Sequence, residues 1–582
     1  MPGALEHSDN LVDLLRARAL ETPEASAFTF LDRGEEPTEH LGFSALDSRA
    51  RTIAAALQAV GAEGQRVLLF YPTGVEFLAA FLGCLYAGAI AVPTSPPLPG
   101  HAPSRLLSVH ADSRPIIALC DASVRGSLEA ILDASPSSTP CLATDDLDEH
   151  LGQGWSVPTV DGNTLALLQY TSGSTSTPKG VMVSHGNLMT NTKVIQTAFE
   201  QPPGAIIVSW LPLFHDMGLI GTALDALTLG SHCVLMDPQS FIMKPVRWLR
   251  AISNYRAHTS GGPDFGYQLC TRKIKDSQLE GIDLSGWKVA FNGSERVRSQ
   301  TVQDFARRFA SVGVTPQTLY PCYGLAESTL FATGGDQSAA PLVESMDAAA
   351  LEDSRGKPAG VDTDRRVDLV SCGRTWCGHQ LLIVDPDTAL PLADEQVGEI
   401  WLAGASVAKG YFNRPNETLE TFGAHTNAGD GPYLRTGDLG FIQEGELFIT
   451  GRLKDLIIVA GNNHHPEDIE QTVEACHPAI RPGGVAAFSL EEDGVERLGV
   501  VAELSVKVLR TLSSGPSSEM EIQTAIVAAA TEAIAARHGL KLGKILLVRA
   551  GTVPKTTSGK VQRRRCKEAY VVGEIDPLGG PL

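Results

Sequence analysis

The first 300 residues alternate short, continuously apolar segments with longer segments of helical periodicity. The apolar segments are RVLLFY at 66–71, IAVPT at 90–94, PIIALC at 115–120, AIIVSWLP at 205–212, SHCVLMD at 231–237 and KVAFNG at 288–293. Strands that are apolar on both faces are typical of parallel sheets covered on both sides, and helical segments such as VEFLAAFLGCLYAGA at 75–89 can supply the covers. The sequence therefore predicts an α/β fold with mostly parallel sheets flanked by helices.

One of the helical segments, FSALDSRARTIAAALQAVG at 43–61, has a clear apolar face. Leu46, Ala50 and Ile53 recur at helical spacing on that face. Ser44 and Asp47 have the spacing of a capping box, in which each side chain bonds the other residue's backbone N–H. We therefore predict a helix that is capped by Ser44.

Two places interrupt the alternating pattern. The segment Gly334–Asp368 is polar and holds few large apolar residues, so it predicts a surface insertion, with a mobile loop as the simpler alternative. After GRLKDLIIVAGNNHHPEDIE at 451–470 the chain continues as a smaller α/β unit with strands GVAAFSL, LGVVAEL and KILLV, and with the helix EIQTAIVAAATEAIAARHGL before the last strand. A chain of 582 residues exceeds one ordinary core. We predict domains at 1–453, with an insertion at about 334–370, and at 454–582.

Charge and cysteine content narrow the class of function. The formal net charge of −20 disfavours a nucleic-acid surface, and the basic run Arg563–Arg565 is short. No apolar stretch approaches a membrane span and no signal-type segment opens the chain, so we expect a cytoplasmic protein. Cys372, Cys377 and His379 form the tightest group of possible metal ligands, but no second pair follows, and no metal site is assigned to them.

The segment LALLQYTSGSTSTPKGVMVSHGN at 165–187 places a loop of small hydroxyl residues after an apolar strand. Gly173 and Gly180 give the loop backbone freedom, and Lys179 is its one charged residue. Such a loop suits oxygen-rich anions. It differs from the common phosphate loop G-x-x-x-x-G-K-[ST], because Pro178 precedes the lysine and a glycine follows it. We interpret it as another kind of nucleotide loop.

Five further segments place polar or glycine residues directly after apolar runs, where α/β sheets bind ligands. They are SWLPLFHDMGL, AFNGSERV, LYPCYGLAES, YLRTGDLG and VPKTTSGKVQRR. Together with the hydroxyl-rich loop, and in this order, they resemble the signature segments of the adenylate-forming enzymes, the superfamily of acyl-CoA ligases, peptide-synthetase adenylation domains and luciferases. The resemblance covers nearly the whole chain. It implies a large N-terminal domain of several subdomains and a small, mobile α+β domain at the C-terminus.

The resemblance also implies a chemistry and a set of site residues. In that superfamily a carboxylate attacks the α-phosphate of ATP and pyrophosphate leaves, so the protein supplies positive charge and oriented donors. The phosphate loop would comprise Thr171, Ser172, Gly173, Ser174, Thr175 and Lys179. The nucleotide base and sugar would contact Asn292, Gly293, Ser294, Tyr323, Gly324, Asp438 and Arg452, with Tyr323 stacked on adenine and Asp438 on the ribose. Glu327, together with Thr175, would hold Mg²⁺.

Two lysines near the C-terminus have implied mechanical roles. Lys560 is similar to the mobile catalytic lysine of the superfamily, and Lys454 corresponds to the hinge about which the small domain rotates. Each assignment has a plainer alternative: Lys179 and Lys560 could be solvated lysines, and Asp438 and Glu327 could be turn and helix-start carboxylates.

The substrate class follows from the subfamily resemblance. Amino-acid-activating domains usually carry aspartate where this chain has His215, with Asp216 one residue later. SGGPDFGYQLC, GEIWLAGASVAKGYFNRPNET and HHPEDIE are similar instead to fatty acyl-AMP ligases. That resemblance implies a medium- or long-chain fatty acid substrate, with an acyl pocket at Phe214, His215, Gly261, Gly262 and Pro263. His215 is assigned a site role, with a buried structural histidine or a helix cap as the alternatives.

The resemblance implies an acyl carrier protein as acceptor, bound in trans through its phosphopantetheine arm in polyketide or lipopeptide synthesis. The polar insertion and GNNHHPEDIE replace acyl-CoA ligase features, and the chain ends soon after Lys560 without a carrier segment. Arg563–Arg565 are a candidate docking patch for that acidic partner. An acyl-CoA ligase and a catalytically silent adenylate-binding protein remain alternatives. Two departures from the family pattern are Ser176, in place of a glycine, and Arg296, in place of a proline.

Overall fold

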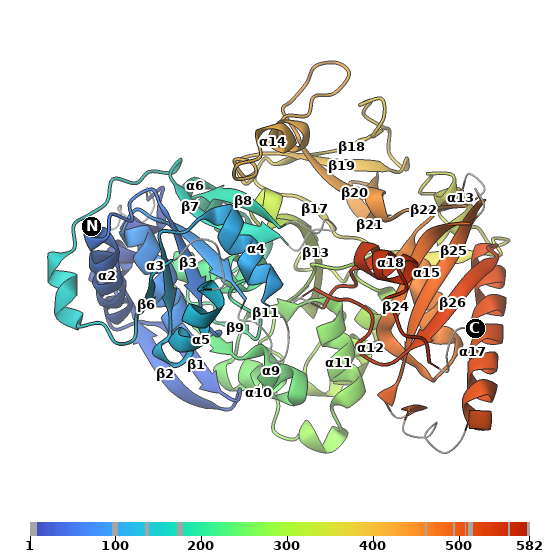
Figure 1. The fold of residues 1–582 in the computed structure, drawn as a ribbon, viewed down its shortest axis with the longest axis horizontal. Helices are drawn as coiled ribbons and strands as arrows, with labels where there is room; N and C mark the ends of the chain where they lie inside the picture. The colour runs from blue at the N-terminus through green and yellow to red at the C-terminus, as the bar shows by residue number, and fades with distance from the viewer. Residues whose placement is uncertain are drawn as a thin grey trace.

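The fold in Figure 1 is that of a computed structural model, which describes residues 8–95, 103–133, 139–171, 178–459, 462–492, 495–506, 508–509, 516–556 and 559–578. Elements from the N-terminal part lie at one end of the view, and those that follow residue 454 lie at the other. The chain passes through the sheets in the α/β manner predicted from its sequence.

A large sheet runs through the middle of the molecule. Its strands, in spatial order, are β17 (Arg374–Thr375), β14 (Phe331–Gly334), β13 (Leu319–Gly324), β12 (Val289–Asn292), β11 (Thr259–Gly262), β9 (Ile207–Ser209), β10 (Cys233–Met236), β1 (Ser26–Asp32) and β2 (Glu36–Gly42). Neighbouring strands from β13 to β1 pair in parallel, whereas the pairs at both edges are antiparallel. The central strands are buried on both faces, which explains their unbroken apolar sequence.

A second sheet has the order β6 (Cys141–Ala143), β5 (Ile117–Cys120), β3 (Arg66–Phe70), β4 (Ile90–Thr94), β7 (Leu165–Thr171) and β8 (Lys179–Ser184). Its strands are parallel apart from the β7–β8 pair. Helix α3 (Val75–Tyr86) contacts strands of both sheets and is buried along nearly its whole length. The two sheets therefore share one apolar layer. Because α3 is buried in this layer on all sides, nearly all of its residues are apolar.

Further helices cover the outer faces of the two sheets and connect their strands. They are α1 (Leu11–Glu21), α2 (Phe43–Ala59), α4 (Ser104–Ser113), α5 (Ala122–Leu132), α6 (His185–Ala198), α7 (Asp216–Gly218), α8 (Asp225–Leu229), α9 (Pro238–Met243), α10 (Val246–Tyr255), α11 (Asp264–Lys273) and α12 (Ser299–Phe309). Short 3-10 or π segments are η1 (Glu149–Gly154), η2 (Leu219–Leu224), η3 (Asp276–Gln278), η4 (Ala310–Val312), η5 (Pro316–Thr318) and η6 (Ala326–Ser328).

The predicted cap of helix α2 is wrong. The helix begins at Phe43 with Gly42 as N-cap, and no side chain caps it. Asp47 instead accepts a hydrogen bond from the Tyr86 hydroxyl (2.8 Å) and pairs with Arg51 (2.7 Å). Because Asp47 bonds the neighbouring helix α3, its side chain does not return to its own helix start.

The polar insertion has regular structure, so the mobile-loop alternative is wrong. Strands β15 (Val343–Asp347) and β16 (Arg366–Val370) pair as an antiparallel ladder, and α13 (Ala348–Glu352) follows β15. Met346, Leu351 and Leu369 form an apolar cluster with Phe441 and Phe448. A few well-placed apolar side chains are enough to anchor the segment, although its overall composition is polar.

A third sheet carries part of the candidate site. It has the order β18 (Gln380–Val384), β19 (Gly398–Ala403), β20 (Leu434–Gln443) and β21 (Glu446–Arg452), all antiparallel, with α14 (Pro415–Phe422) against β20. Figure 1 places this sheet on one side of the large sheet, next to the elements that follow residue 454.

The elements after β21 form their own apolar cluster. They are η7 (Leu453–Asp455), β22 (Ile457–Val459), β23 (Asn462–His464), α15 (Pro466–Cys476), β24 (Ile480–Glu492), β25 (Val495–Leu504), α17 (Pro516–His538), β26 (Leu542–Val548) and α18 (Arg563–Val571). Buried side chains from Ile457 to Leu547 pack on one another around the sheet β24-β25-β26. Within the ranges that the structure describes, no helix is long and apolar enough to cross a bilayer.

A buried carboxylate in the large sheet region makes the stability of the protein depend on pH. Asp225 is fully buried, and burial raises its pKa to about 7, although Gln201 donates a hydrogen bond to it at 2.8 Å. An acid with a raised folded pKa is destabilising when ionised, so this penalty develops as the pH rises from about 4 to about 7.

Asp225→Asn is therefore expected to raise the melting temperature more at pH 8 than at pH 5. The gain in unfolding free energy should be about 3 kcal/mol larger at pH 8 than at pH 5, because the penalty grows over the two units between pH 5 and the pKa of about 7, at about 1.4 kcal/mol per unit. Scanning fluorimetry at both pH values measures the effect, with exposed Asp394→Asn as the control. An equal shift at pH 5 and pH 8 would show that Asp225 does not titrate in this range.

Candidate active site

The carboxyl ends of four neighbouring parallel strands meet at one edge of the large sheet. The strands are β9, β11, β12 and β13, and their registers place them side by side. The residues that follow or end them are His215, Pro263, Asn292–Ser294 and Tyr323–Gly324. Gln169 Nε2, from β7 of the second sheet, donates to the Phe214 carbonyl at 3.1 Å. Segments from both sheets thus converge where an α/β fold binds ligands.

Tyr323, Asp438 and Arg452 form one hydrogen-bonded group. The Tyr323 hydroxyl donates to Asp438 Oδ2 at 2.7 Å, and Arg452 Nε donates to Asp438 Oδ1 at 2.7 Å. Asp438 and Arg452 are register partners on β20 and β21. Burial and then Asp438 raise the pKa of Tyr323, while Asp438 raises the pKa of Arg452 above its usual range despite burial. Both oxygens of this carboxylate are thus oriented by groups on different elements.

The backbone of the predicted base-binding segments is closely packed. A Cβ on Gly324 would lie 1.8 Å from the Leu330 carbonyl oxygen, so only glycine fits there. Ser294 has a positive φ of 74°, which fixes an unusual turn after β12. Asn292 donates to Asp264 Oδ1 at 3.0 Å, and its own Oδ1 is buried without a hydrogen-bond partner among the described residues. A ligand amino group such as that of adenine would satisfy this acceptor.

Lys179 and Glu327 lie on either side of Tyr411. Lys179 forms an ion pair with Glu417, and its Nζ lies 4.9 Å from the centroid of the Tyr411 ring. The Tyr411 hydroxyl donates to Glu327 Oε1 at 2.8 Å. The lysine predicted to bind phosphate and the carboxylate predicted to bind a metal therefore contact the same tyrosine. Thr171 ends β7 next to them in the ladder, paired with Lys179.

Part of the predicted phosphate loop falls outside the described ranges. These residues are Ser172, Gly173, Ser174, Thr175 and Ser176. Thr171 and Lys179, which flank them, are described and lie opposite each other on β7 and β8. The two ends of the predicted loop therefore meet at the edge of the second sheet.

Lys560 enters the site from the C-terminal part of the chain. Burial and the charge of Arg452 lower the pKa of Lys560, and the charges of Asp216, Glu295 and Asp438 oppose that shift. Its backbone N–H donates to Thr556 Oγ1 at 3.1 Å, and its carbonyl accepts from the Thr556 N–H at 2.8 Å. The lysine thus lies within electrostatic range of the group around Asp438.

His215 is a neutral group at physiological pH. Burial and the charges of Arg105 and Lys560 lower its pKa to about 3. The imidazole therefore supplies hydrogen bonds but no positive charge to this site. The side chain is half-buried at the start of α7, with its ring centroid 4.7 Å from that of Phe214. It forms no side-chain cap bond to α7. This position agrees better with a role at the mouth of a pocket than with a helix cap.

The residues predicted to line an acyl pocket end or follow two neighbouring strands, β9 and β11. A Cβ on Gly261 would lie 2.2 Å from the Phe291 carbonyl oxygen, and one on Gly262 would lie 2.6 Å from the Trp210 ring. Phe214 lines a small hollow of about 10 Å³ together with Thr94, Arg105 and Tyr170. Pro263 precedes α11 and lies outside that hollow.

The structure shows the surroundings of Lys454 and of the basic run Arg563–Arg565. Lys454 lies in η7, the short helix that directly follows β21. Arg563 forms ion pairs with Asp455 (3.0 Å), Glu467 (2.9 Å) and Glu470 (2.7 Å). The interpretation of Arg563 as part of a docking patch is therefore wrong, because three carboxylates occupy its guanidinium. Arg564 and Arg565 are exposed.

Several site residues were not predicted from the sequence. Arg105 lies near His215 and donates to the Tyr170 carbonyl at 3.1 Å, while Glu295 accepts the Phe265 N–H at 2.8 Å and acts on the charge of Lys560. Tyr411 and Glu417 frame Lys179. Glu295 and Tyr411 occur within signature segments, which was an available signal, whereas the position of Arg105 depends on long-range packing.

Comparisons with known proteins identify the family of this chain. The AMP-binding enzyme family matches residues 15–412, and the AMP domain of Disco-interacting protein 2-like proteins matches residues 454–578. The chain is 40% identical over 576 residues to the medium-chain-fatty-acid–[acyl-carrier-protein] ligase JamA of Moorena producens (strain JHB), covering 97% of this chain and 96% of JamA.

Two further relatives carry the same chemistry in their names. The long-chain-fatty-acid–AMP ligase FadD26 of Mycobacterium bovis is 37% identical over 572 residues, covering 96% of each chain. The structure of a fatty acyl-adenylate ligase from L. pneumophila, in complex with acyl adenylate and pyrophosphate, is 38% identical with a TM-score of 0.76, covering 98% of this chain and 97% of that one. The chain is therefore a ligase of the AMP-binding, adenylate-forming enzyme family and belongs to its fatty acyl-AMP ligase subfamily.

Proposed function

We propose that this enzyme activates a medium- or long-chain fatty acid with ATP and transfers the acyl group to the phosphopantetheine thiol of an acyl carrier protein. The proposal is carried by the hydrogen-bonded group Tyr323–Asp438–Arg452, together with the position of the segment before Lys560, where a Cβ on Gly559 would lie 3.6 Å from the Phe265 ring. One ligand that spans a ribose site and a lysine from the C-terminal part of the chain is an acyl adenylate. The printed activities of JamA and FadD26 support the same chemistry.

In the first step a fatty carboxylate oxygen attacks the α-phosphorus of ATP, the bond to the β-phosphate oxygen breaks, and pyrophosphate leaves. Asp438 accepts hydrogen bonds from the ribose hydroxyls, while Asn292, Gly293, Ser294, Tyr323 and Gly324 line the base site. Lys560 stabilises the negative charge that develops on the α-phosphate oxygens, and Lys179 with the loop at 171–175 binds the departing phosphates. The substrate carboxylate is the nucleophile, so the protein needs none.

We propose that Glu327, with Thr175, holds Mg²⁺. A bound Mg²⁺ neutralises phosphate charge during the displacement. Carboxylate and hydroxyl oxygens are the donors that this ion prefers, and the Glu327 carboxylate is oriented by a hydrogen bond from Tyr411. The Tyr411 hydroxyl engages Oε1 of that carboxylate.

We propose that the chain divides into a large domain of residues 1–453, including the insertion at about 334–370, and a small domain of residues 454–582, with Lys454 as the hinge. The separate apolar cluster from Ile457 onward supports this division. Polar contacts such as Arg296 with Asp468 join the two parts. Polar interfaces suit domains that change their relative orientation.

In the second step the carrier thiol attacks the acyl carbon and AMP leaves with the electron pair of the broken bond, while the thiol proton passes to solvent. The small domain would rotate to withdraw Lys560 and admit the pantetheine arm. The neutral His215 would hydrogen-bond the fatty carboxylate, with Phe214, Gly261, Gly262 and Pro263 near the acyl chain. ATP and carrier proteins are supplied in the cytoplasm, and we propose that the enzyme acts there.

A product assay tests this function. The enzyme is incubated with ATP, Mg²⁺ and fatty acids of mixed length, together with equal amounts of CoA and a panel of holo carrier proteins, and products are identified by intact mass. We expect pyrophosphate release that depends on fatty acid, and acyl-carrier product well in excess of acyl-CoA. Efficient acyl-CoA formation would instead identify an acyl-CoA ligase, and nucleotide binding without any product would identify a silent adenylate-binding protein.

A further inference from the structure

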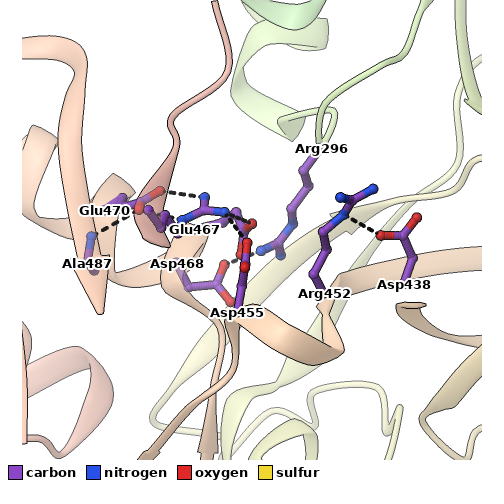
Figure 2. Close-up of polar contacts among 9 residues, drawn as sticks. Arg296, Asp438, Arg452, Asp455, Glu467, Asp468, Glu470 and Ala487 are labelled. Atoms are coloured by element: carbon purple, nitrogen blue, oxygen red, sulfur yellow. Dashed lines mark hydrogen bonds and ion pairs between the residues drawn. The ribbon is translucent and has the colours of Figure 1, made fainter. Parts of the chain in front are cut away.

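Two arginines follow the base-binding segment directly and reach the helix α15 of the small domain. Arg296 Nη1 lies 2.7 Å from Asp468 Oδ1, and Arg298 Nη1 lies 3.1 Å from Glu474 Oε2. Figure 2 shows Arg296 extending from its loop toward Asp468, close to the Arg452–Asp438 pair. Both ion pairs therefore cross from the loop that should hold adenine to the body that carries the catalytic lysine.

The side chains of both ion pairs are largely buried. The Arg296 and Asp468 side chains are 18% and 15% exposed, and those of Arg298 and Glu474 are 33% and 10% exposed. Shielded charge pairs with direct hydrogen bonds interact more strongly than surface pairs, for which the median contribution is close to zero. These contacts can thus bias a domain orientation.

On the small-domain side, α15 is connected to the segment of Lys560. Arg563, at the start of α18, bonds Glu467 and Glu470 on α15 and also Asp455 in η7. Glu470 also accepts the Ala487 N–H at 3.0 Å, which links α15 to β24 (Figure 2). Because Arg563 lies three residues after Lys560, a shift of α15 moves the start of α18 and the lysine segment with it.

On the large-domain side, the same short loop carries a carboxylate whose charge acts on Lys560. Glu295 precedes Arg296 and lies within electrostatic range of Lys560. It also accepts the Phe265 N–H at 2.8 Å, which fixes its carboxylate at the start of α11. Residues 295–298 thus carry one carboxylate whose charge acts on Lys560 and two arginines that pair with α15.

We propose that Arg296 and Arg298 are positioning residues that hold the small domain in the orientation in which Lys560 reaches the phosphate. The inference rests on the proposed two-step function, because only the first step uses this orientation. The second step requires the two ion pairs to break. Arg296, which departs from the family pattern in the sequence, therefore favours the adenylation step over the transfer step.

The two half-reactions are measured separately to test this proposal. Acyl-adenylate formation is followed by fatty-acid-dependent exchange of labelled pyrophosphate into ATP. Transfer is followed by mixing enzyme with synthetic acyl adenylate and holo carrier protein. In the double variant Arg296→Ala with Arg298→Ala, we expect exchange to fall about tenfold and transfer to stay equal to wild type or to rise, since a tenfold population shift corresponds to the loss of about one shielded ion pair.

A charge exchange and a matched control sharpen the test. Arg296→Asp alone should slow pyrophosphate exchange, and its combination with Asp468→Arg should restore much of the lost rate. Arg307→Ala is the control, because Arg307 pairs with Asp304 within the large domain and its side chain is 73% exposed. It should leave both half-reactions unchanged.

Hydrogen exchange provides a readout that needs no turnover. In the double variant, amides at 295–300 and in α15 should exchange faster than in wild type, while those of β3 and β5 should not change. The proposal would be overturned if the double variant lost pyrophosphate exchange and acyl transfer equally. It would also be overturned if amide protection at 295–300 and in α15 did not change. A wild-type enzyme without either half-reaction would overturn the proposed function instead, while hydrogen exchange would still decide whether the ion pairs hold the small domain.

Discussion

Replacing Lys560 by alanine is expected to slow acyl-adenylate formation about a thousandfold. In the proposed mechanism the lysine is the cation that the small domain brings to the α-phosphate, and the loss of one preorganised donor to a developing oxyanion typically costs a factor of about 10²–10³. Burial of Lys560 near Arg452 should make its charge more effective than that of a solvated lysine. Pyrophosphate release in a single turnover, with ATP and fatty acid saturating, measures this rate.

The control for this variant is Lys541→Ala, since Lys541 is an exposed lysine of the same small domain. It should leave pyrophosphate release unchanged. Lys560→Ala should also retain transfer from supplied acyl adenylate, because the lysine is withdrawn in that step. An unaltered rate of pyrophosphate release in Lys560→Ala would refute the role of this residue.

Asp438→Ala is expected to weaken ATP binding about a hundredfold. The carboxylate would lose its bonds to the ribose, and hydrogen bonds to a charged group contribute about 1.5–3 kcal/mol each. The variant also leaves the buried Tyr323 hydroxyl and Arg452 without their acceptor. Isothermal titration with ATP or AMP measures the affinity directly, and KM for ATP should rise by a similar factor.

Tyr323→Phe separates the ribose role of Asp438 from its role as an acceptor for Tyr323. This variant keeps the aromatic ring and removes one donor to the carboxylate, so we expect AMP affinity to fall by less than about tenfold. If Tyr323→Phe and Asp438→Ala weakened AMP binding equally, the carboxylate would act through the tyrosine and would not contact the sugar.

The sequence was sufficient to predict the sheets because their strands are apolar on both faces. Segments such as RVLLFY and SHCVLMD became β3 and β10, and the helix at 75–89 became α3 between two sheets. The start of α2 could not be predicted in the same way. Asp47 has the spacing of a cap, but its actual partner, Tyr86, is set by the packing of α2 on α3.

The candidate site was predictable where residues fall in signature segments after strands. Tyr323, Asp438 and Arg452 lie far apart in sequence, and the structure joins them through hydrogen bonds. The position of Tyr411 in a signature segment marks it as a candidate site residue, but its pairing with Glu327 could not be inferred, because the local sequence does not indicate which group it faces.

The basic run at 563–565 and the polar insertion show a second limit. A count of charges indicates an exposed basic patch, yet Arg563 is surrounded by carboxylates of α15 and η7. A polar composition indicates a loop, yet Met346 and Leu369 anchor a ladder on Phe441 and Phe448. Composition reports the average of a segment, whereas its structure depends on the few side chains that find a partner.

The central claim is that one acyl adenylate occupies the cleft between the two domains, with its ribose on Asp438 and its phosphate on Lys560. A crystal structure with a non-hydrolysable sulfamoyl analogue of the acyl adenylate tests it most directly. We predict ribose hydroxyls bonded to Asp438 and the Lys560 ammonium within hydrogen-bond distance of the sulfamoyl group, which replaces the phosphate. An analogue bound away from Asp438, or Lys560 turned from the sulfamoyl group while Arg296 still bonds Asp468, would contradict this account.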